Sequence, residues 1–107
     1  MLECRIYVGL HDKDYHKQFF ETDIYKMALK DICVKYRVPY SLQMLEGGYF
    51  HDDGTWVEEN TLLITLVGAP KRTVYSIAKD LCVMFHQESV MITTGNVVTF
   101  NVRDDSK

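Results

Sequence analysis

The fold is decided by the stretch LLITLVGAP at positions 62–70. Its strand portion is apolar apart from Thr65, which predicts the end of a long strand over 56–67 that is buried on both faces. Gly68 ends this strand, and Pro70 suits the first turn of a helix. The helix itself is predicted by apolar residues at the spacing i, i+3, i+4, i+7, i+8 and i+11, namely Val74, Ile77, Ala78, Leu81, Cys82 and Phe85.

The residues before this stretch predict a strand, a helix and a second strand. Apolar residues alternate with others over 2–10, which is the period of a strand. An amphipathic helix is predicted over 22–38, between a threonine N-cap and the proline that follows. Residues 40–49 predict a strand, with a bulge or a close backbone approach at the glycine pair 47–48. A hairpin turn at 52–54 leads into the long strand.

The residues after the second helix predict a short strand over 89–93 and a hairpin turn at 95–96. Val98, Phe100 and Val102 then alternate in an extra C-terminal strand. The order is that of an α+β, ferredoxin-like βαββαβ sandwich, with two helices on one face of an antiparallel sheet. Right-handed crossovers give the strand order 2-3-1-4, with the extra strand beside the fourth or on a neighbouring chain. We expect a single domain over 1–103 and a disordered tail over 104–107.

Composition excludes several classes of protein. The chain has 107 residues and a formal net charge of −3, so no basic field attracts nucleic acid directly. No apolar run is long enough for a membrane span, and the first residues lack a secretory pattern. We therefore expect a cytoplasmic protein of the host-cell cytosol. Cys4, Cys33 and Cys82 are widely spaced and are interpreted as buried hydrophobic residues in a reducing compartment.

Three polar segments, distant in sequence, are predicted to meet at one edge of the sheet. The first strand leads into 11–18, the central hairpin spans 49–56, and 86–88 precedes the fourth strand. Because loops on a rigid scaffold commonly carry binding residues, this edge is the predicted ligand site. The candidate ligand-binding residues are His11, Asp12, Lys13, Lys17, Gln18, Tyr49, His51, Trp56, Glu59, His86, Gln87 and Glu88.

Trp56 and Tyr49 are the large rings nearest this edge. Their flat faces could stack a base, while Lys13, Lys17 and Gln18 contact phosphate or ribose. The alternative is simple cross-strand packing of the two rings over the hairpin.

No reaction motif is present. The histidines at 11, 16, 51 and 86 lack the spacing of a metal site, and we predict no metal, no cofactor and no catalytic residue. The protein is accordingly interpreted as a non-enzymatic binder. A nuclease or phosphodiesterase is the enzymatic alternative, and its residues would be His11, His51, His86, Glu58 and Glu88. The apolar sheet face left uncovered by the helices predicts a homo-oligomer, either a dimer or a trimer.

Two resemblances extend this interpretation. The segments 8–14, 17–18, 48–54, 59–62 and 87–90 resemble a family of small domains of unknown function that is frequent in phages and mobile elements of Gram-positive gut bacteria. The matching positions are Asp12, Lys13, Asp14, Gln18, Gly54, Glu59, Gln87 and Glu88, and His86 departs from the family pattern. The order of elements is also similar to that of CutA and the signal-transducing PII proteins, and this likeness implies a trimer with ligand sites between subunits.

The leading hypothesis is a phage-type anti-defence protein that acts stoichiometrically. It would sequester a nucleotide-like immune signal in pockets between subunits. One alternative is a protein-directed inhibitor of a host defence effector, such as an anti-CRISPR. Another is a PII-like or CutA-like sensor of a metal or a nucleotide.

Overall fold

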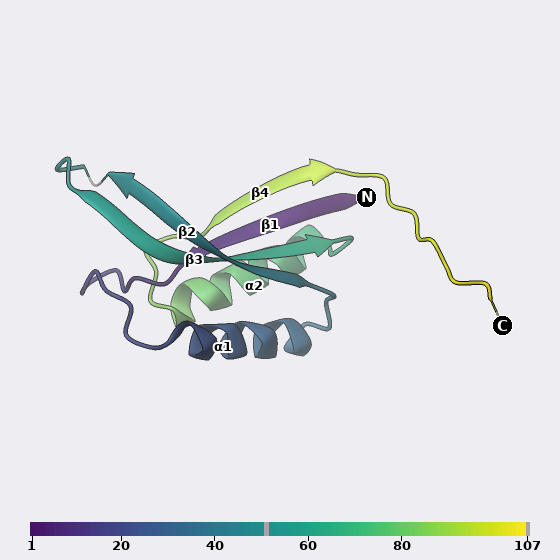
Figure 1. The fold of residues 1–107 in the computed structure, drawn as a ribbon, viewed down its shortest axis with the longest axis horizontal. Coiled ribbons are helices and arrows are strands. Elements are labelled where there is room, and N and C mark those ends of the chain that lie inside the picture. The colour runs from purple at the N-terminus through teal and green to yellow at the C-terminus, as the bar shows by residue number, and fades with distance from the viewer. Residues whose placement is uncertain (51, 107) are drawn as a thin grey trace.

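The computed structural model describes residues 1–50 and 52–106 and confirms the predicted order of elements. Both helices lie on one side of a four-stranded antiparallel sheet, whose order is β2-β3-β1-β4 (Figure 1). The elements are β1 (Leu2–Gly9), α1 (Thr22–Lys35), β2 (Ser41–Phe50), β3 (Trp56–Val67), α2 (Lys71–Met84) and β4 (Met91–Asn96).

The core lies between the sheet and the helices. Alternate residues of β1 and β3 face the helices, and Ile6 lies opposite Ile64 with both side chains fully buried. Leu29 of α1 and Leu81 of α2 are also fully buried and cover these strands. Each such side chain contributes about 1.5–3 kcal/mol of burial free energy. The apolar spacing read in the sequence is therefore the spacing that packs the core.

Both helices end in the same capping motif. The N–H of Arg37 donates to the carbonyl of Val34, and the N–H of Val38 donates to that of Cys33. This is the Schellman pattern, with Arg37 in the left-handed region at φ 55°. In α2, His86 takes the same place at φ 53°. The first helix therefore ends at Lys35, earlier than the predicted boundary before Pro39.

The predicted hairpin at 95–96 is wrong, and the extra strand predicted after it does not form beside β4 in this chain. β4 continues through Gly95, which pairs with Glu3, and Asn96, which pairs with Leu2. The N–H of Val97 then donates to the carbonyl of Met1 at 2.8 Å. A glycine does not force a turn where the neighbouring strand still offers partners. Residues 97–106 form no strand in this chain.

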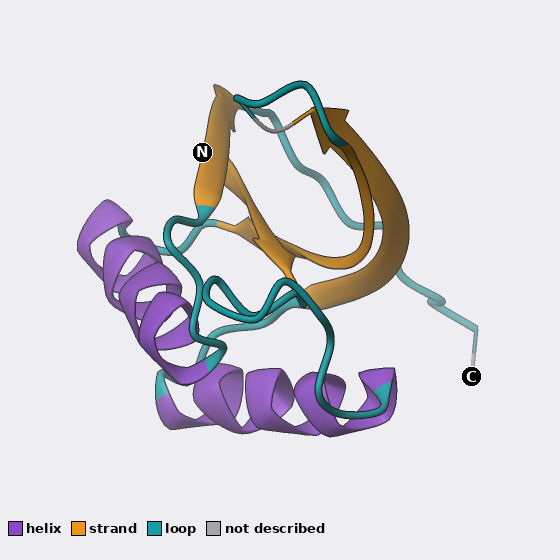
Figure 2. Cartoon of the chain, turned by 90° about the vertical axis from the view of Figure 1, so that its left-hand side faces the viewer, coloured by secondary structure: helices purple, strands orange, loops and turns teal. Residues whose placement is uncertain are grey.

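The sheet is strongly curved away from the helices (Figure 2). The β2–β3 ribbon and the β1–β4 pair diverge on the uncovered side (Figure 1). That side is mixed in character, because Leu63 lies there beside Tyr7, whereas Arg5 lies opposite Thr65 and Thr93. Neither helix in the described part of the chain has the length and apolar character that crossing a membrane requires.

Candidate functional site

The three polar segments meet as predicted. The N–H of Leu10 donates to the carbonyl of Asn60 at 3.0 Å, which joins the first segment to β3. The side chain of Gln87 donates to the carbonyl of His11 at 2.6 Å, and the N–H of Lys13 donates to the carbonyl of His86 at 3.0 Å. The loop after β1 is therefore fixed to the central ribbon on one side and to the end of α2 on the other.

Asp12 holds this loop in shape. Its Oδ1 accepts the N–H groups of Asp14 and Tyr15 at 2.9 and 3.1 Å, and its Oδ2 lies 2.6 Å from His86 Nδ1. Burial pushes the pKa of the Asp12 carboxyl upward. The hydrogen bonds from Asp14, His86 and Tyr15 outweigh burial, so this pKa lies below its usual value. Asp12 is thus an ionised brace of the loop.

Asp14 completes a small cluster with Asp12 and His86. The Nε2 of His86 lies 3.5 Å from Asp14 Oδ2, and the potential ligand atoms of the three residues lie within 4.8 Å of one another. These atoms could in principle hold a metal ion. However, both oxygens of Asp12 and both ring nitrogens of His86 already face partners within the cluster. The arrangement is accounted for by closure of the loop.

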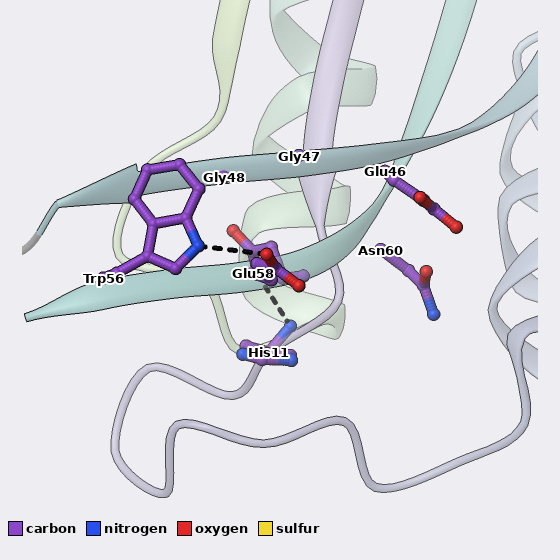
Figure 3. Close-up of a pocket in the computed structure, with 8 residues that line it drawn as sticks. His11, Glu46, Gly47, Gly48, Trp56, Glu58 and Asn60 are labelled. Carbon is purple, nitrogen blue, oxygen red and sulfur yellow. Dashed lines mark hydrogen bonds between the residues drawn. The ribbon is translucent and has the colours of Figure 1, made fainter.

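A cavity of about 460 Å³ opens beside the cluster, between the loop and the β2–β3 ribbon (Figure 3). Its volume is in the range of small-molecule sites. The lining residues come from the loop after β1 and from the two ribbon strands, and they are His11, Glu46, Gly47, Gly48, Trp56, Glu58, Glu59 and Asn60.

The indole of Trp56 forms one wall of this cavity. Its Nε1 donates to Glu58 Oε1 at 3.0 Å, and Phe50 packs edge-on with the ring centroids 5.0 Å apart. The ring also lies against Gly48, where an added Cβ would come within 2.3 Å of the indole. Trp56 nevertheless remains 51% exposed. Glycine at position 48 therefore lets the ring lie flat on β2 while another part of it stays free for a ligand.

Glu59 is placed by a second glycine. Its carboxylate occupies the volume beside Gly9, where a Cβ would approach an oxygen of Glu59 to 2.6 Å. Glu59 Oε2 accepts the N–H of His11 at 3.1 Å. The side chain borders the Trp56 cavity and also a smaller cavity that contains Tyr49. Glu59 is thus a half-buried carboxylate between two cavities.

The electrostatics of the cavity were not anticipated. Glu46, Glu58 and Glu59 line it, and no lysine or arginine is among its lining residues in the described chain. Three carboxylates attract a cation and repel a phosphate. In the same wall, the Nδ1 atom of His11 is buried and has no hydrogen-bond partner among the described residues. The site therefore suits a positively charged ligand with an aromatic part.

The predicted base-stacking pair is separated by the structure. Side chains alternate along β2, so Tyr49 points to the face of the ribbon opposite the one that Gly48 shares with Trp56. It borders the smaller cavity and does not line the cavity beside Trp56. Burial, followed by the charge of Glu59, raises the pKa of Tyr49. The smaller cavity has a volume of about 240 Å³. Trp56 and Tyr49 can therefore not stack on one base from the same side.

The predicted phosphate contacts are also displaced from the cavity. Lys13 and Lys17 do not line it, and Lys17 Nζ lies 5.2 Å from the ring centroid of Phe19. Gln18 is used inside the loop, where its Oε1 accepts from Asn60 Nδ2 at 3.0 Å and its Nε2 donates to the carbonyl of Phe20. The sequence correctly placed these residues at the edge of the sheet that carries the cavity, but it did not determine whether their side chains point into the cavity.

The remaining predicted site residues have mixed positions. His11, Trp56 and Glu59 line the cavity, whereas Glu88 does not. His51 lies outside the described residues. The sequence prediction omitted Glu46, Gly47, Gly48 and Asn60 from the site, and it named Glu58 as a candidate only for the enzymatic alternative. The glycine pair was the available signal, because its proposed close backbone approach is confirmed, whereas the ladder runs without a bulge from Glu46 to Phe50.

Solved structures with a similar fold include a phage enzyme. No protein-family model and no curated protein sequence matches this chain. A phage SAM lyase in complex with S-methyl-5′-thioadenosine is similar, with a TM-score of 0.67 and 26% identity over 88% of this chain and 79% of the lyase. The same lyase in its apo state has a TM-score of 0.68 and 25% identity, again over 88% of this chain and over 78% of that one.

CutA and PII-like proteins share the fold alone. A CutA protein from Pyrococcus horikoshii has a TM-score of 0.60 at 10% identity, over 94% of this chain and 88% of that one. GlnK of B. subtilis in complex with ATP has a TM-score of 0.50 at 12% identity, over 89% and 84%. The expected likeness to phage proteins and to the CutA and PII fold is thus confirmed.

The prediction of a non-enzymatic protein is contradicted by the first of these comparisons. The phage protein that resembles this chain at 26% identity is a lyase, and therefore an enzyme. The sequence argument failed because it searched for reaction motifs, and cleavage of an activated substrate does not require a nucleophile motif or a metal motif.

Proposed function

We propose that this chain is a phage-type lyase that cleaves S-adenosylmethionine in the cavity beside Trp56. The observation that carries the proposal is the charge of the cavity, which is lined by Glu46, Glu58 and Glu59 and by no lysine or arginine among the described residues. S-adenosylmethionine has a cationic sulfonium and a cationic ammonium group. The similarity of this chain to the phage lyase is the second support for the proposal.

The geometry suggests how such a ligand would bind. Its adenine ring would stack on the exposed part of Trp56, which is fixed from behind by Gly48 and at its edge by Phe50. The sulfonium would lie near the ring and the carboxylates, where both the π-face and the negative charge favour a cation. Asn60 and the imidazole of His11 supply polar groups in the same wall.

The proposed reaction breaks the bond between the sulfonium sulfur and the γ-carbon of the methionine part. The electron pair of that bond goes to sulfur, which leaves as neutral S-methyl-5′-thioadenosine. The substrate's own carboxylate bonds to the γ-carbon and closes a five-membered lactone. Atoms and charge balance without water, an oxidant or a proton from the protein. The cavity would accelerate this step by holding the adenosine and amino-acid ends of the substrate in place and by excluding water.

The charge of the cavity also favours release of the product. The substrate sulfonium is attracted by the carboxylates, whereas the thioether product is neutral and loses this attraction. In a cell, consumption of S-adenosylmethionine would deny the methyl donor to host methyltransferases. The proposed reaction thus supports an anti-defence role through depletion of S-adenosylmethionine. This role takes the place of the hypothesis drawn from the sequence, sequestration of a phosphate-bearing immune signal.

The test is to incubate the purified protein with S-adenosylmethionine and to follow S-methyl-5′-thioadenosine by liquid chromatography and mass spectrometry. We expect product from the wild type and a KM raised about three- to tenfold in Glu58→Gln, since one ionic contact is removed while the amide oxygen still accepts from Trp56. Glu88→Gln is the matched control, because Glu88 does not line the cavity.

S-adenosylhomocysteine separates charge from shape. It keeps the adenosine and the amino acid but has a neutral sulfur, so we expect weaker binding and no cleavage. Absence of thioadenosine product at all enzyme concentrations would overturn the proposal. Equal affinity for the two compounds would overturn the role given to the carboxylates. An unsaturated four-carbon amino acid in place of the lactone or its hydrolysis product would exclude lactone closure in favour of an elimination.

A further inference from the structure

Residues 97–103 follow β4 and leave the body of the molecule (Figure 1). Val98, Phe100 and Val102 are 94%, 85% and 89% exposed. Within the described chain, no backbone hydrogen bond joins residues 98–103 to the rest. Alternation with a period of two is the pattern of a strand that is apolar on one face. This segment therefore has the sequence of a strand but lacks a sheet within its own chain.

The sheet offers two free edges, at β2 and at β4. The β2 edge is flanked by apolar side chains, since Met44, Tyr49 and Phe50 are 44%, 42% and 68% exposed. Residues 41–50 contain neither lysine nor proline, the residues that commonly prevent pairing at an edge. In β4, in contrast, four of the six residues form the polar run 93–96. An apolar strand is therefore better matched by β2.

The segment cannot reach this edge in its own molecule. β2 and β4 lie at opposite sides of the sheet, separated by β3 and β1. Crossing three strand spacings takes about 14 Å, which is about four extended residues. Too few of residues 97–103 would remain to pair along β2. If residues 97–103 pair with a β2 edge, that edge therefore belongs to a second copy of this chain.

We propose that residues 97–103 of one copy add as a fifth strand to the β2 edge of a second copy. The antiparallel direction is favoured by charge, because it places Asp104 and Asp105 toward the start of β2, near Arg37 in the sequence. The parallel direction would bring them toward Glu46 and Glu58. The contact is heterologous, so copies that each give one segment and receive one form a ring when the rotation closes.

This association bears directly on the cavity. Glu46, Gly47 and Gly48 of β2 line it, so a strand added outside β2 would run along its rim. The side chains of a second copy would then help to enclose the ligand. The association itself does not rest on the proposed reaction, because it is measured without any substrate.

The first test is the mass of the full chain in solution, measured by light scattering after size exclusion. We expect an oligomer for the wild type and a monomer for the double variant Val98→Asp/Phe100→Asp, with unchanged far-ultraviolet circular dichroism. Thr99→Asp/Asn101→Asp is the matched control, because it adds the same charge on the other face of the segment and should stay oligomeric. A monomeric wild type at high micromolar concentration, or an oligomeric Val98→Asp/Phe100→Asp, would overturn the proposal.

The second test locates the edge. Met44→Lys places a charge beside β2 and should also give a monomer, whereas Met91→Lys at the β4 edge should leave the oligomer intact. The opposite result would assign the contact to β4 and overturn the pairing proposed here. Failure of either test leaves cleavage of S-adenosylmethionine open to its own assay, so the two proposals fail separately.

Discussion

Gly48 determines where the indole of Trp56 lies, because any side chain at this position would overlap the ring. Gly9 does the same for the carboxylate of Glu59. The shape of the site thus depends on two glycines, one in β2 and one in β1, that leave room for neighbouring side chains. Sequence reasoning noticed the glycine at 48 as a close approach but had no way to identify which ring approaches it.

Gly48→Ala tests this arrangement. The added methyl group would sit 2.3 Å from the indole, so Trp56 must move, and we expect affinity for S-adenosylmethionine to fall at least about tenfold. Isothermal titration calorimetry measures the loss. Gly95→Ala is the control, since nothing lies within 4 Å of its added methyl group. Equal affinity of Gly48→Ala and the wild type would show that the ring position is unimportant.

Asp12 gives a prediction about pH. Its folded pKa is lowered, so the stabilisation it provides is present above the unfolded pKa and is lost as pH falls through the folded value. Urea unfolding should therefore find Asp12→Asn less stable than the wild type at pH 7 and at pH 5. The difference should shrink once the pH is well below about 3.9. Asp31→Asn, at an exposed position of α1, is the control, and an undiminished difference at low pH would contradict the explanation.

The helix ends show how an element can serve two purposes. Arg37 and His86 both take the left-handed position of a Schellman cap, where glycine is the favoured residue. Arg37 makes no side-chain hydrogen bond or ion pair to the described residues, whereas His86 pairs with Asp12. The strained backbone at Arg37 is therefore not offset by a side-chain contact among the described residues. The strained backbone at His86 is accompanied by the contact with Asp12 that fixes the loop after β1.

These two caps should respond differently to glycine. Arg37→Gly removes backbone strain and should raise the free energy of unfolding by about 0.5–1 kcal/mol. His86→Gly removes the same strain but also the contact with Asp12, so we expect no gain or a loss. Chemical denaturation of both variants makes the comparison. A gain of equal size in His86→Gly would show that the pairing with Asp12 contributes nothing to stability.

The elements themselves were predictable because their periods are unambiguous. Both helices, the strand order and the single covered face followed from apolar spacing and right-handed crossovers. The fate of Gly95 was not predictable, since turn propensity competes with a neighbouring strand whose length is known only in the fold. The direction of Lys13 and Lys17 was likewise undetermined, because side chains in loops follow local hydrogen bonds rather than a period.

At the scale of the whole molecule, the proposed exchange of residues 97–103 links assembly to activity. If a second copy borders the cavity, dilution should lower the rate per subunit. We expect the specific activity to fall at enzyme concentrations below those at which the oligomer persists in light scattering. Thr99→Asp/Asn101→Asp should dissociate over the same concentration range as the wild type. A constant specific activity through complete dissociation would show that one chain forms the whole site.

The wall of the cavity contains the chain's single tryptophan, at position 56, half exposed and held by Glu58 and Phe50. Its emission therefore comes entirely from the place where a ligand would arrive. Stopped-flow fluorescence of the unlabelled protein can time entry, chemistry and departure as separate phases. The fold thus has its own optical reporter, and the kinetic sequence is accessible without attaching a dye.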